Sequence, residues 1–235
     1  MRPAQRVSIL PTRRAHSVEA SAFTLIELLV VIAIIVILAG LILATAGYVQ
    51  KKGIRARAET EIAALSAALE SYKADNGVYP RDPTPNTATD LLDARTMVDP
   101  ALADATVYNA ASLVLYRALS GDRNRDRTVS ALDETLDIDG STLSSPLTQL
   151  PRSYFAFKPN QLSPIDQTLN VTFVQDPFGN SYGYSTAYQA WIDGGSVGTQ
   201  KGYNPMFDLW STAGTAPSPT PTPPAKQQDL WIKNW

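Results

Sequence analysis

Hydrophobic residues are distributed very unevenly along this chain of 235 residues. From Leu28 to Gln50 there are 23 consecutive residues without a charge, and nearly all of them are Leu, Ile, Val or Ala. A helix of about 20 such residues is long enough to cross the hydrocarbon layer of a membrane. The run therefore predicts a membrane-inserted helix, and it argues against a fully soluble globular enzyme.

A second hydrophobic pattern indicates that the helix continues beyond this run. Apolar residues recur there at spacings of three and four, which is typical of one buried helix face: Ile54, Ala58, Ile62, Leu65, Leu69 and Tyr72. The other faces carry two i,i+4 ion pairs, Arg55 with Glu59 and Arg57 with Glu61. No proline occurs between Thr12 and Tyr79, so residues 23 to 76 can form one helix of about 80 Å, ended by Gly77.

The C-terminal part of the chain has the short-period pattern of a small antiparallel sheet. Three segments rich in aromatic or β-branched residues are predicted as strands: 154 to 158, 170 to 175 and 181 to 188. Asp176-Pro177-Phe178-Gly179-Asn180 has the composition of a tight turn, because Pro presets φ and Gly takes a positive φ. We expect Trp210, Trp231 and Trp235 to seal the open side of the sheet, which gives an α+β fold.

Composition removes several classes of chemistry. The chain has no cysteine, and its single histidine, His16, precedes the apolar run. Thiol catalysis, disulfides and a histidine-ligated metal in the processed chain are therefore excluded. The first 22 residues carry four Arg and one Glu, whereas the whole chain has a formal charge of -2, so the remainder is at -5. Nucleic-acid-binding domains are usually basic, and no nucleic-acid partner is expected.

Two processing schemes fit the N-terminal segment. In the first, 28 to 43 is the apolar core of a secretory signal and Ala44-Thr45-Ala46 is its cleavage site, which releases a soluble protein beginning at Gly47. Against this scheme, the run exceeds the usual length of roughly 7 to 15 residues. It also begins beside an acidic residue, Glu27.

The second scheme rests on residues 21 to 31, Ser-Ala-Phe-Thr-Leu-Ile-Glu-Leu-Leu-Val-Val. This segment closely resembles the cleavage and methylation motif of type IV prepilins and type II secretion pseudopilins. The resemblance implies that a prepilin peptidase cuts between Ala22 and Phe23 and that the new amine of Phe23 is methylated. Most members of the family have Gly at the position of Ala22.

Glu27 has two readings that can hold together. Thr24-Leu25-Ile26-Glu27 fits a capping box, with a carboxylate in the first turn of a helix. Capping alone does not explain a carboxylate next to a membrane-spanning run, where an acidic group toward the bilayer centre costs about 2.5 to 3.5 kcal/mol. The family resemblance implies a second role, in which Glu27 pairs with the Phe23 amine of a neighbouring subunit during assembly.

Three further segments, 72 to 80, 176 to 184 and 207 to 211, resemble motifs of the G-type major pseudopilins. The implied fold is pilin-like: a long N-terminal α-helix, transmembrane in its first half, packed on a small antiparallel β-sheet. The resemblance divides the first part of the chain into a cleaved leader at 1–22, a transmembrane and assembly helix at 23–50 and its amphipathic continuation at 51–77. A variable insertion follows at 78–150, with a short helix around 110–119 and a candidate calcium loop. The chain then ends with an antiparallel sheet at 151–210 and a Pro-rich loop with a Trp-containing tail at 211–235.

The insertion contains a second candidate site. Its residues match the calcium loops of EF-hands and dockerin-like repeats, which bind the ion through side-chain oxygens at loop positions 1, 3, 5 and 12 and a backbone carbonyl at position 7. The side-chain ligands would be Asp122, Asn124, Asp126 and Asp133, and the carbonyl would be that of Thr128. Arg127 stands where Gly is expected, and a solvated charged loop is the alternative. In G-type pseudopilins calcium tends to lie in the final loop. Here the loop from 212 to 224 contains no carboxylate, and the next one along the chain is Asp229. We therefore interpret the loop as an extended tether that lets residues 229 to 235 dock.

The resemblance implies a structural, non-enzymatic subunit of a type II secretion pseudopilus, a helical fibre that helps export folded proteins. Its implied partners are copies of itself, other pseudopilins, the prepilin peptidase, the inner-membrane assembly platform and membrane lipid. No cofactor is required, and Ca²⁺ is optional. The implied location is the bacterial inner membrane, single-pass, with a cytoplasmic leader and a periplasmic C-terminal domain that is extracted into a periplasmic fibre.

Charge does not fix this orientation, because Arg13 and Arg14 precede the apolar run while Lys51 and Lys52 follow it. Two alternatives remain open. One is a type IV pilin-like surface fibre for adhesion, motility or DNA uptake. The other is a secreted soluble protein cleaved after Ala46, with carboxylates such as Asp133 and Glu134 as the available catalytic groups.

Overall fold

The computed structural model describes residues 24–84, 87–96, 105–214 and 229–235, with no side-chain description at 44–46 and 105. The cleavage residues Ala22 and Phe23, the leader and the prolines from 217 to 224 lie outside the described residues. The chain divides into two compact units, Met1–Tyr48 and Val49–Trp235, which are called unit 1 and unit 2 below.

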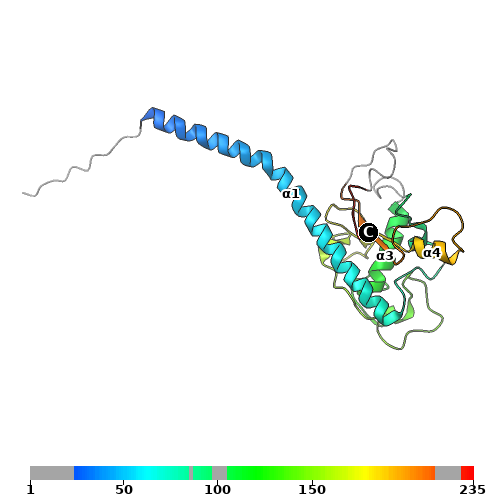
Figure 1. Ribbon diagram of the computed structural model, residues 1–235. Helices are drawn as coiled ribbons and strands as arrows, with labels where there is room; N and C mark the ends of the chain where they lie inside the picture. Colours follow the sequence, from blue (N-terminus) through cyan, green and yellow to red (C-terminus); the bar gives the residue numbers. More distant parts are fainter. Residues whose placement is uncertain (1–23, 85–86, 97–104, 215–228) are drawn as a thin grey trace, which may run out of the picture. The chain divides into compact units, whose positions relative to one another are not determined.

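The longest element is helix α1, Leu25–Asn76, with 52 residues. Its apolar first part belongs to unit 1, and its amphipathic second part belongs to unit 2 (Figure 1). The helix ends where the sequence predicts. Gly77 has a φ of 78° and donates its backbone N–H to the carbonyl of Lys73 at 2.7 Å, a conformation that glycine adopts without a steric penalty.

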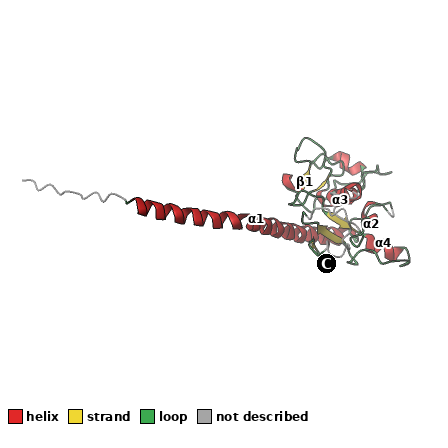
Figure 2. Cartoon of the chain, turned by 90° about the horizontal axis from the view of Figure 1, so that it is seen from above, coloured by secondary structure: helices red, strands yellow, loops and turns green. Residues whose placement is uncertain are grey.

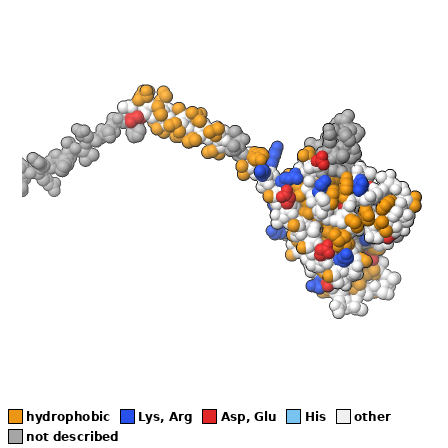
Figure 3. Space-filling model, viewed as in Figure 1, with side chains coloured by type: hydrophobic (Ala, Val, Ile, Leu, Met, Phe, Trp, Pro, Cys, Tyr) orange, Lys and Arg blue, Asp and Glu red, His pale blue; other side chains and the backbone are white. Residues whose placement is uncertain are grey.

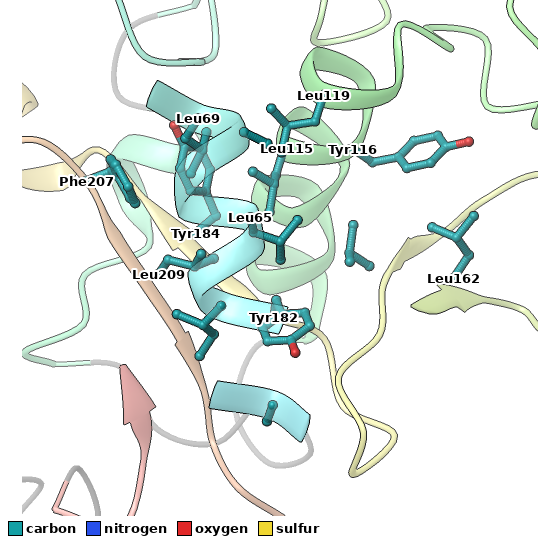
Figure 4. Packing of buried hydrophobic residues seen from close by; sticks show 14 of the residues in the cluster. Leu65, Leu69, Leu115, Tyr116, Leu119, Leu162, Tyr182, Tyr184, Phe207 and Leu209 are labelled. Atoms are coloured by element: carbon teal, nitrogen blue, oxygen red, sulfur yellow. The ribbon is translucent and has the colours of Figure 1, made fainter. Parts of the chain in front are cut away.

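The core of unit 2 forms between α1 and a second helix, α3, Ala105–Ser120. Leu65 and Leu69 of α1 face Leu115 and Leu119 of α3 (Figure 4). Four residues of the predicted apolar stripe are buried: Ala58, Ile62, Leu65 and Leu69. Tyr72 is half-buried against the same core, and Ile54 keeps 37% of its surface exposed.

Two small antiparallel sheets complete unit 2, where the sequence predicts one (Figure 2). The first pairs β1, Leu162–Ser163, with β2, Phe173–Val174. The second has the order β3-β4-β5, with β3 at Gly183–Ser185, β4 at Asp208–Ser211 and β5 at Ile232–Lys233. The predicted turn lies between them: the Asp176 carboxylate accepts the N–H groups of Phe178 and Asn180, and Gly179 has a φ of 96°.

The prediction of a strand at 154 to 158 is wrong. The N–H groups of Tyr154 and Phe155 both donate to the Leu119 carbonyl, at 2.7 and 3.0 Å. They therefore supply the hydrogen bonds for a carbonyl at the C-terminal end of α3 and do not pair with a neighbouring strand. The prediction at 181 to 188 is too long, because Ala187 begins helix α4, Ala187–Asp193. Short helical segments also lie at Ala88–Leu91 (α2), Ala131–Thr135 and Pro159–Gln161.

The tryptophans close the second sheet, as the sequence predicts. Trp210 of β4 is fully buried and stacks on Trp231, with ring centroids 5.8 Å apart. Tyr108 of α3 lies against the edge of the Trp210 ring and accepts a hydrogen bond from its Nε1 at 3.2 Å. Trp210 also contacts Trp235 edge-on. These rings form a core between β4 and α3.

The chain's last residues pack on the sheet and on α1 within unit 2, as expected for 229 to 235. Strand β5 pairs with β4, and Arg55 of α1 donates to the Leu230 carbonyl at 2.9 Å. The C-terminal tail is thus held both by the sheet and by the first helix of the unit.

Candidate functional site

The capping box predicted at the start of α1 is present. The backbone N–H and the hydroxyl of Thr24 both donate to Glu27 Oε2, each at 2.9 Å. In return the Glu27 backbone N–H donates to the Thr24 hydroxyl at 3.3 Å. Both hydrogen bonds to the carboxylate use one oxygen, and Oε1 accepts no hydrogen bond from any described residue. Among the described residues, one carboxylate oxygen of Glu27 therefore has no donor.

The surface that follows Glu27 is apolar on every side. The large hydrophobic side chains of α1 in unit 1 are exposed, from 47% at Val31 to 82% at Leu25 (Figure 3). By length and composition α1 is able to cross a membrane, and none of its apolar window is buried. Exposed apolar surface of this extent marks a site of contact with lipid or with other apolar helices. A core helix of a soluble protein would instead be covered.

The predicted calcium-loop residues lie in one hydrogen-bonded loop after α3. Asp122 Oδ1 accepts the Arg125 N–H and Asp122 Oδ2 accepts the Arg127 N–H, both at 2.7 Å. Asp133 accepts the N–H groups of Arg123 and Asn124 through Oδ1, at 2.6 and 2.9 Å. The two carboxylates at the ends of the loop therefore fold the backbone around themselves.

Arg127 takes the backbone conformation that the motif assigns to glycine. Its φ is 74°, in the left-handed region that a side chain adopts at a cost of about 1 kcal/mol or more. Its guanidinium donates to the carbonyls of Pro164 and Leu169 at 2.6 and 3.0 Å. These bonds offset the backbone strain and explain how an arginine is accommodated at this position.

The Asp122 carboxyl group is buried beside Tyr116, whose hydroxyl donates to Oδ2 at 2.7 Å. Burial raises the pKa of Asp122, while the hydrogen bonds it accepts act in the opposite direction. Asp133 is also buried and caps the helical turn at Ala131–Thr135 through the Ser130 N–H, at 2.7 Å. Both carboxylates organise the backbone, and the catalytic use of Asp133 with Glu134 stays an untested alternative.

No group of three or more His, Cys, Asp or Glu side chains is placed to hold a metal within the part of the chain that the structure describes. Calcium at Asp122, Asn124, Asp126, Thr128 and Asp133 stays a prediction, with the solvated loop as its alternative.

Under the calcium hypothesis, Ca²⁺ at about 100 times its dissociation constant raises the free energy of unfolding by about 2.7 kcal/mol. Calorimetry of the full chain in detergent with and without Ca²⁺ measures this shift. Asp126→Asn is expected to abolish it. Asp166→Asn is the matched control, because Asp166 makes the same turn with Thr168 that Asp126 makes with Thr128. The absence of any shift at millimolar Ca²⁺ supports the solvated loop.

A third cluster of polar groups, which the sequence did not indicate, holds the turn before β4. Asp208 is 1% exposed, and its two oxygens accept the N–H groups of Tyr203 and Asn204, each at 2.8 Å. Asp93 accepts the N–H of Gly202 at 2.9 Å. A charged residue inside the apolar segment 207 to 210 is the sequence signal that could have revealed this site.

Burial raises the pKa of Asp208 to about 6, although its two backbone hydrogen bonds act to lower it. An unfolded aspartate titrates near pH 3.9. Because the folded-state pKa is the higher one, the contribution of Asp208 to stability is fully present below about pH 4 and is lost as the pH rises through about 6. The difference corresponds to a loss on the order of 3 kcal/mol.

Carboxyl ¹³C chemical shifts, measured against pH on the full chain in detergent, test this expectation. Asp208 is expected to titrate near pH 6. Asp193 is an internal control, because the Arg81 guanidinium beside it lowers its pKa below the ordinary value. A midpoint for Asp208 at or below that of Asp193 would contradict the prediction.

Comparison with known proteins supports one part of the sequence reading. Over 60 residues the chain is 42% identical to a protein named type II secretion system core protein G from Vibrio cholerae serotype O1. The similarity covers 26% of this chain and 41% of that relative, so the chain spans about two fifths of the relative's length. No protein-family model matches the chain, and no solved structure matches it. The similarity confirms the resemblance to type II secretion core proteins over this stretch.

Proposed function

We propose that this chain is a structural subunit of a type II secretion pseudopilus, with no enzymatic role. The observation that carries the proposal is α1: its first part is apolar and exposed on every side, while its second part is built into a folded domain. The similarity to a type II secretion core protein supports the same assignment. A membrane anchor that can leave the bilayer for a bundle of like helices explains both halves of α1.

In this proposal the prepilin peptidase cuts between Ala22 and Phe23, and Phe23 is then methylated. The chain is stored in the inner membrane as a single-pass protein, with its leader in the cytoplasm and unit 2 in the periplasm. An inner-membrane platform assembles it with copies of itself and other pseudopilins into a helical fibre. Growth of the fibre in the periplasm then drives folded proteins out of the cell.

Glu27 has a specific part in the proposed assembly. Thr24 occupies one of its carboxylate oxygens, so the other can receive the Phe23 amine of a neighbouring subunit. Such a pair, excluded from water in the fibre core, fixes the axial register between subunits, because an unpaired charge there is costly.

N-terminal sequencing and mass spectrometry of the chain purified from its own cells test the processing step. The proposal expects a mature chain that begins with methylated Phe23. A mature chain that begins at Gly47 would instead support secretion as a soluble protein, and would overturn both the anchor and the fibre.

The surface pilin is the second candidate function, because the N-terminal segment is shared between the two kinds of fibre. A deletion strain separates them. Loss of protein secretion with no change in surface fibres supports the pseudopilus, whereas loss of surface fibres, motility or DNA uptake with normal secretion supports the pilin.

A further inference from the structure

A cleft of about 470 Å³ lies in unit 2 where helices α1 and α3 both end. Tyr72 of α1 and Arg117 of α3 line it, together with Arg123 of the loop that follows α3. The segment from 147 to 154 completes the walls and contributes Arg152. Three arginines from three parts of the chain therefore face one cleft, and no acidic residue belongs to its described lining.

Backbone carbonyls hold the guanidinium groups of Arg117 and Arg123 in place. Arg117 donates from Nε to the Arg123 carbonyl at 3.0 Å and from Nη1 to the Asp139 carbonyl at 2.7 Å. Arg123 donates from Nη1 to the carbonyl of Leu136. Neither arginine forms an ion pair with a described residue, and the Nη2 atom of each has no partner there. Two positioned donors, each on an uncompensated charge, thus remain for a ligand.

The third arginine is compensated, and it lies beside an aromatic wall. Arg152 pairs with Asp75 of α1, and its guanidinium carbon lies 5.3 Å from the centre of the Tyr154 ring. Tyr72 meets the Tyr154 ring edge-on, with centroids 5.2 Å apart. The Tyr72 hydroxyl has no partner in the part of the chain that the structure describes. It adds a neutral donor to those of Arg117 and Arg123.

The cleft carries about one net positive charge. The C-terminal ends of α1 and α3 each contribute about half a negative charge, which offsets part of the two guanidinium charges. Burial lowers the pKa of Arg117, and the next largest influence is the positive charge of Arg125, which acts in the same direction. Each neighbouring aspartate, such as Asp139, opposes this change with a smaller effect. Nearby acids therefore leave Arg117 without a dominant partner.

We propose that this cleft binds a carboxylate group of an organic ligand, held by Arg117, Arg123 and the Tyr72 hydroxyl. Guanidinium groups bind carboxylates and phosphates through paired N–H donors. Phosphate sites often add a helix N-terminus or a nest of backbone N–H groups. Both helices at this cleft instead present their C-termini, and about one positive charge matches a singly charged carboxylate better than a doubly charged phosphate.

The size and walls of the cleft favour an organic ligand over an inorganic ion. Its volume lies in the range of pockets that hold small organic molecules. Leu147, Leu150, Pro151 and the ring of Tyr154 supply apolar surface for the body of such a ligand. The carboxylate can belong to a free organic acid or to an acidic side chain of a partner protein, because both present the same group.

Isothermal titration calorimetry of the full chain in neutral detergent at pH 7 tests the proposal and separates the two sources. The free acid is 3-phenylpropionate, and the protein source is a blocked pentapeptide with one central glutamate. Their neutral counterparts are 3-phenylpropionamide and the glutamine peptide. We expect at least one carboxylate to bind tenfold or more tightly than its neutral counterpart, and to bind more weakly as the NaCl concentration rises. Whichever probe binds identifies the source.

Two outcomes of the titration would overturn the proposal. In the first, neither carboxylate binds more tightly than its amide. In the second, inorganic phosphate binds as tightly as the better carboxylate, which would make the cleft a general anion site.

Three substitutions test the assigned residues with the carboxylate probe that binds. Arg123→Gln is expected to weaken binding at least tenfold. Arg57→Gln makes the same change at an arginine that does not line the cleft, and is expected to alter affinity less than twofold. Tyr72→Phe keeps the packing of the ring and removes its hydroxyl, so a several-fold loss is expected. Circular dichroism and thermal unfolding establish that each variant is folded.

Equal effects of Arg123→Gln and Arg57→Gln would refute the assignment. If Arg123→Gln does not fold, Tyr72→Phe decides the question, and unchanged affinity in that variant counts against the site. None of these measurements needs a membrane or a fibre. A chain that binds the carboxylate but forms no fibre would refute the proposed function and leave the cleft standing.

Discussion

Replacing Glu27 with Gln is expected to block fibre assembly while cleavage between Ala22 and Phe23 proceeds. In the proposed fibre, the substitution leaves the Phe23 amine of the neighbouring subunit without its carboxylate in an apolar core. Removing one partner of a buried ion pair costs about 3 to 5 kcal/mol. That corresponds to roughly a hundredfold or greater loss in the affinity of a subunit for the fibre end. Fibres sheared from cells and quantified by immunoblot measure the loss, and mass spectrometry of the membrane fraction follows processing.

Glu59→Gln is the control for the same chemical change on the same helix. Glu59 is exposed and pairs with Arg55 at 3.4 Å. An exposed pair of this kind contributes about 0 to 1 kcal/mol, so fibre yield is expected to stay normal. Normal yield from Glu27→Gln would refute the charge-pairing account.

A third variant separates pairing from capping. Thr24→Ala removes the hydroxyl that bonds Glu27 but retains the carboxylate, and loss of a helix cap costs about 1 kcal/mol. If capping were the whole role of Glu27, the Thr24 and Glu27 variants would reduce fibre yield equally. The pairing account expects a much smaller effect from Thr24→Ala.

Substituting Gly183 with Ala is expected to destabilise unit 2 strongly. Gly183 pairs with Trp210 across β3 and β4, and a Cβ atom at Gly183 would lie 2.2 Å from the Trp210 ring. The ring has nowhere to move, because Trp231 stacks on it and Tyr108 abuts its edge. Overpacking of this kind costs about 1 to 3 kcal/mol and occasionally more, out of a total stability of about 5 to 15 kcal/mol. Chemical denaturation of the full chain in detergent, followed by tryptophan fluorescence, measures it.

Gly53→Ala gives the opposite sign with the same added methyl group. Gly53 lies inside α1, and a Cβ there meets no atom within 4 Å. Alanine in a helix interior is favoured over glycine by about 0.5 to 1 kcal/mol, so this variant is expected to be slightly more stable.

A smaller side chain at position 210 is expected to relieve the clash in Gly183→Ala. The combination with Trp210→Leu is expected to be less destabilising than the sum of the two single changes, and strict additivity would show that the clash is not the cause.

The helical part of the fold was predictable because its signals are local. The spacing of apolar residues defines the buried face of α1, and Gly77 ends the helix through its own backbone freedom. The turn at Asp176 is equally local, since the carboxylate bonds the N–H groups two and four residues ahead.

Features that depend on distant contacts were missed. The aromatic pattern at Tyr154 and Phe155 is typical of a strand, but the N–H groups there bond to Leu119 at the end of α3. Glu61 was placed on the polar side of α1, yet it is 9% exposed and bonds a tyrosine 121 residues away. Neither outcome has a signal in the neighbouring sequence.

The candidate sites divide in the same way. The residues around Glu27 form a contiguous motif, so both the capping box and the proposed cleavage site can be read from a few neighbouring positions. The loop from Asp122 to Asp133 is also contiguous, and its turn geometry follows the motif even with Arg127 in place of glycine. Asp208 has no such motif, because its importance comes from residues that only folding brings next to it.

The attachment of the C-terminal tail to α1 has a consequence for the order in which the molecule is made. Arg55, near the start of unit 2, holds the carbonyl of Leu230, and β5 supplies the last strand of its sheet. These contacts join residues about 175 positions apart. Unit 2 cannot reach its final state while the ribosome still covers its last residues. Synthesis therefore completes the apolar part of α1 well before the domain behind it can close, and in the proposed membrane protein the anchor is engaged first.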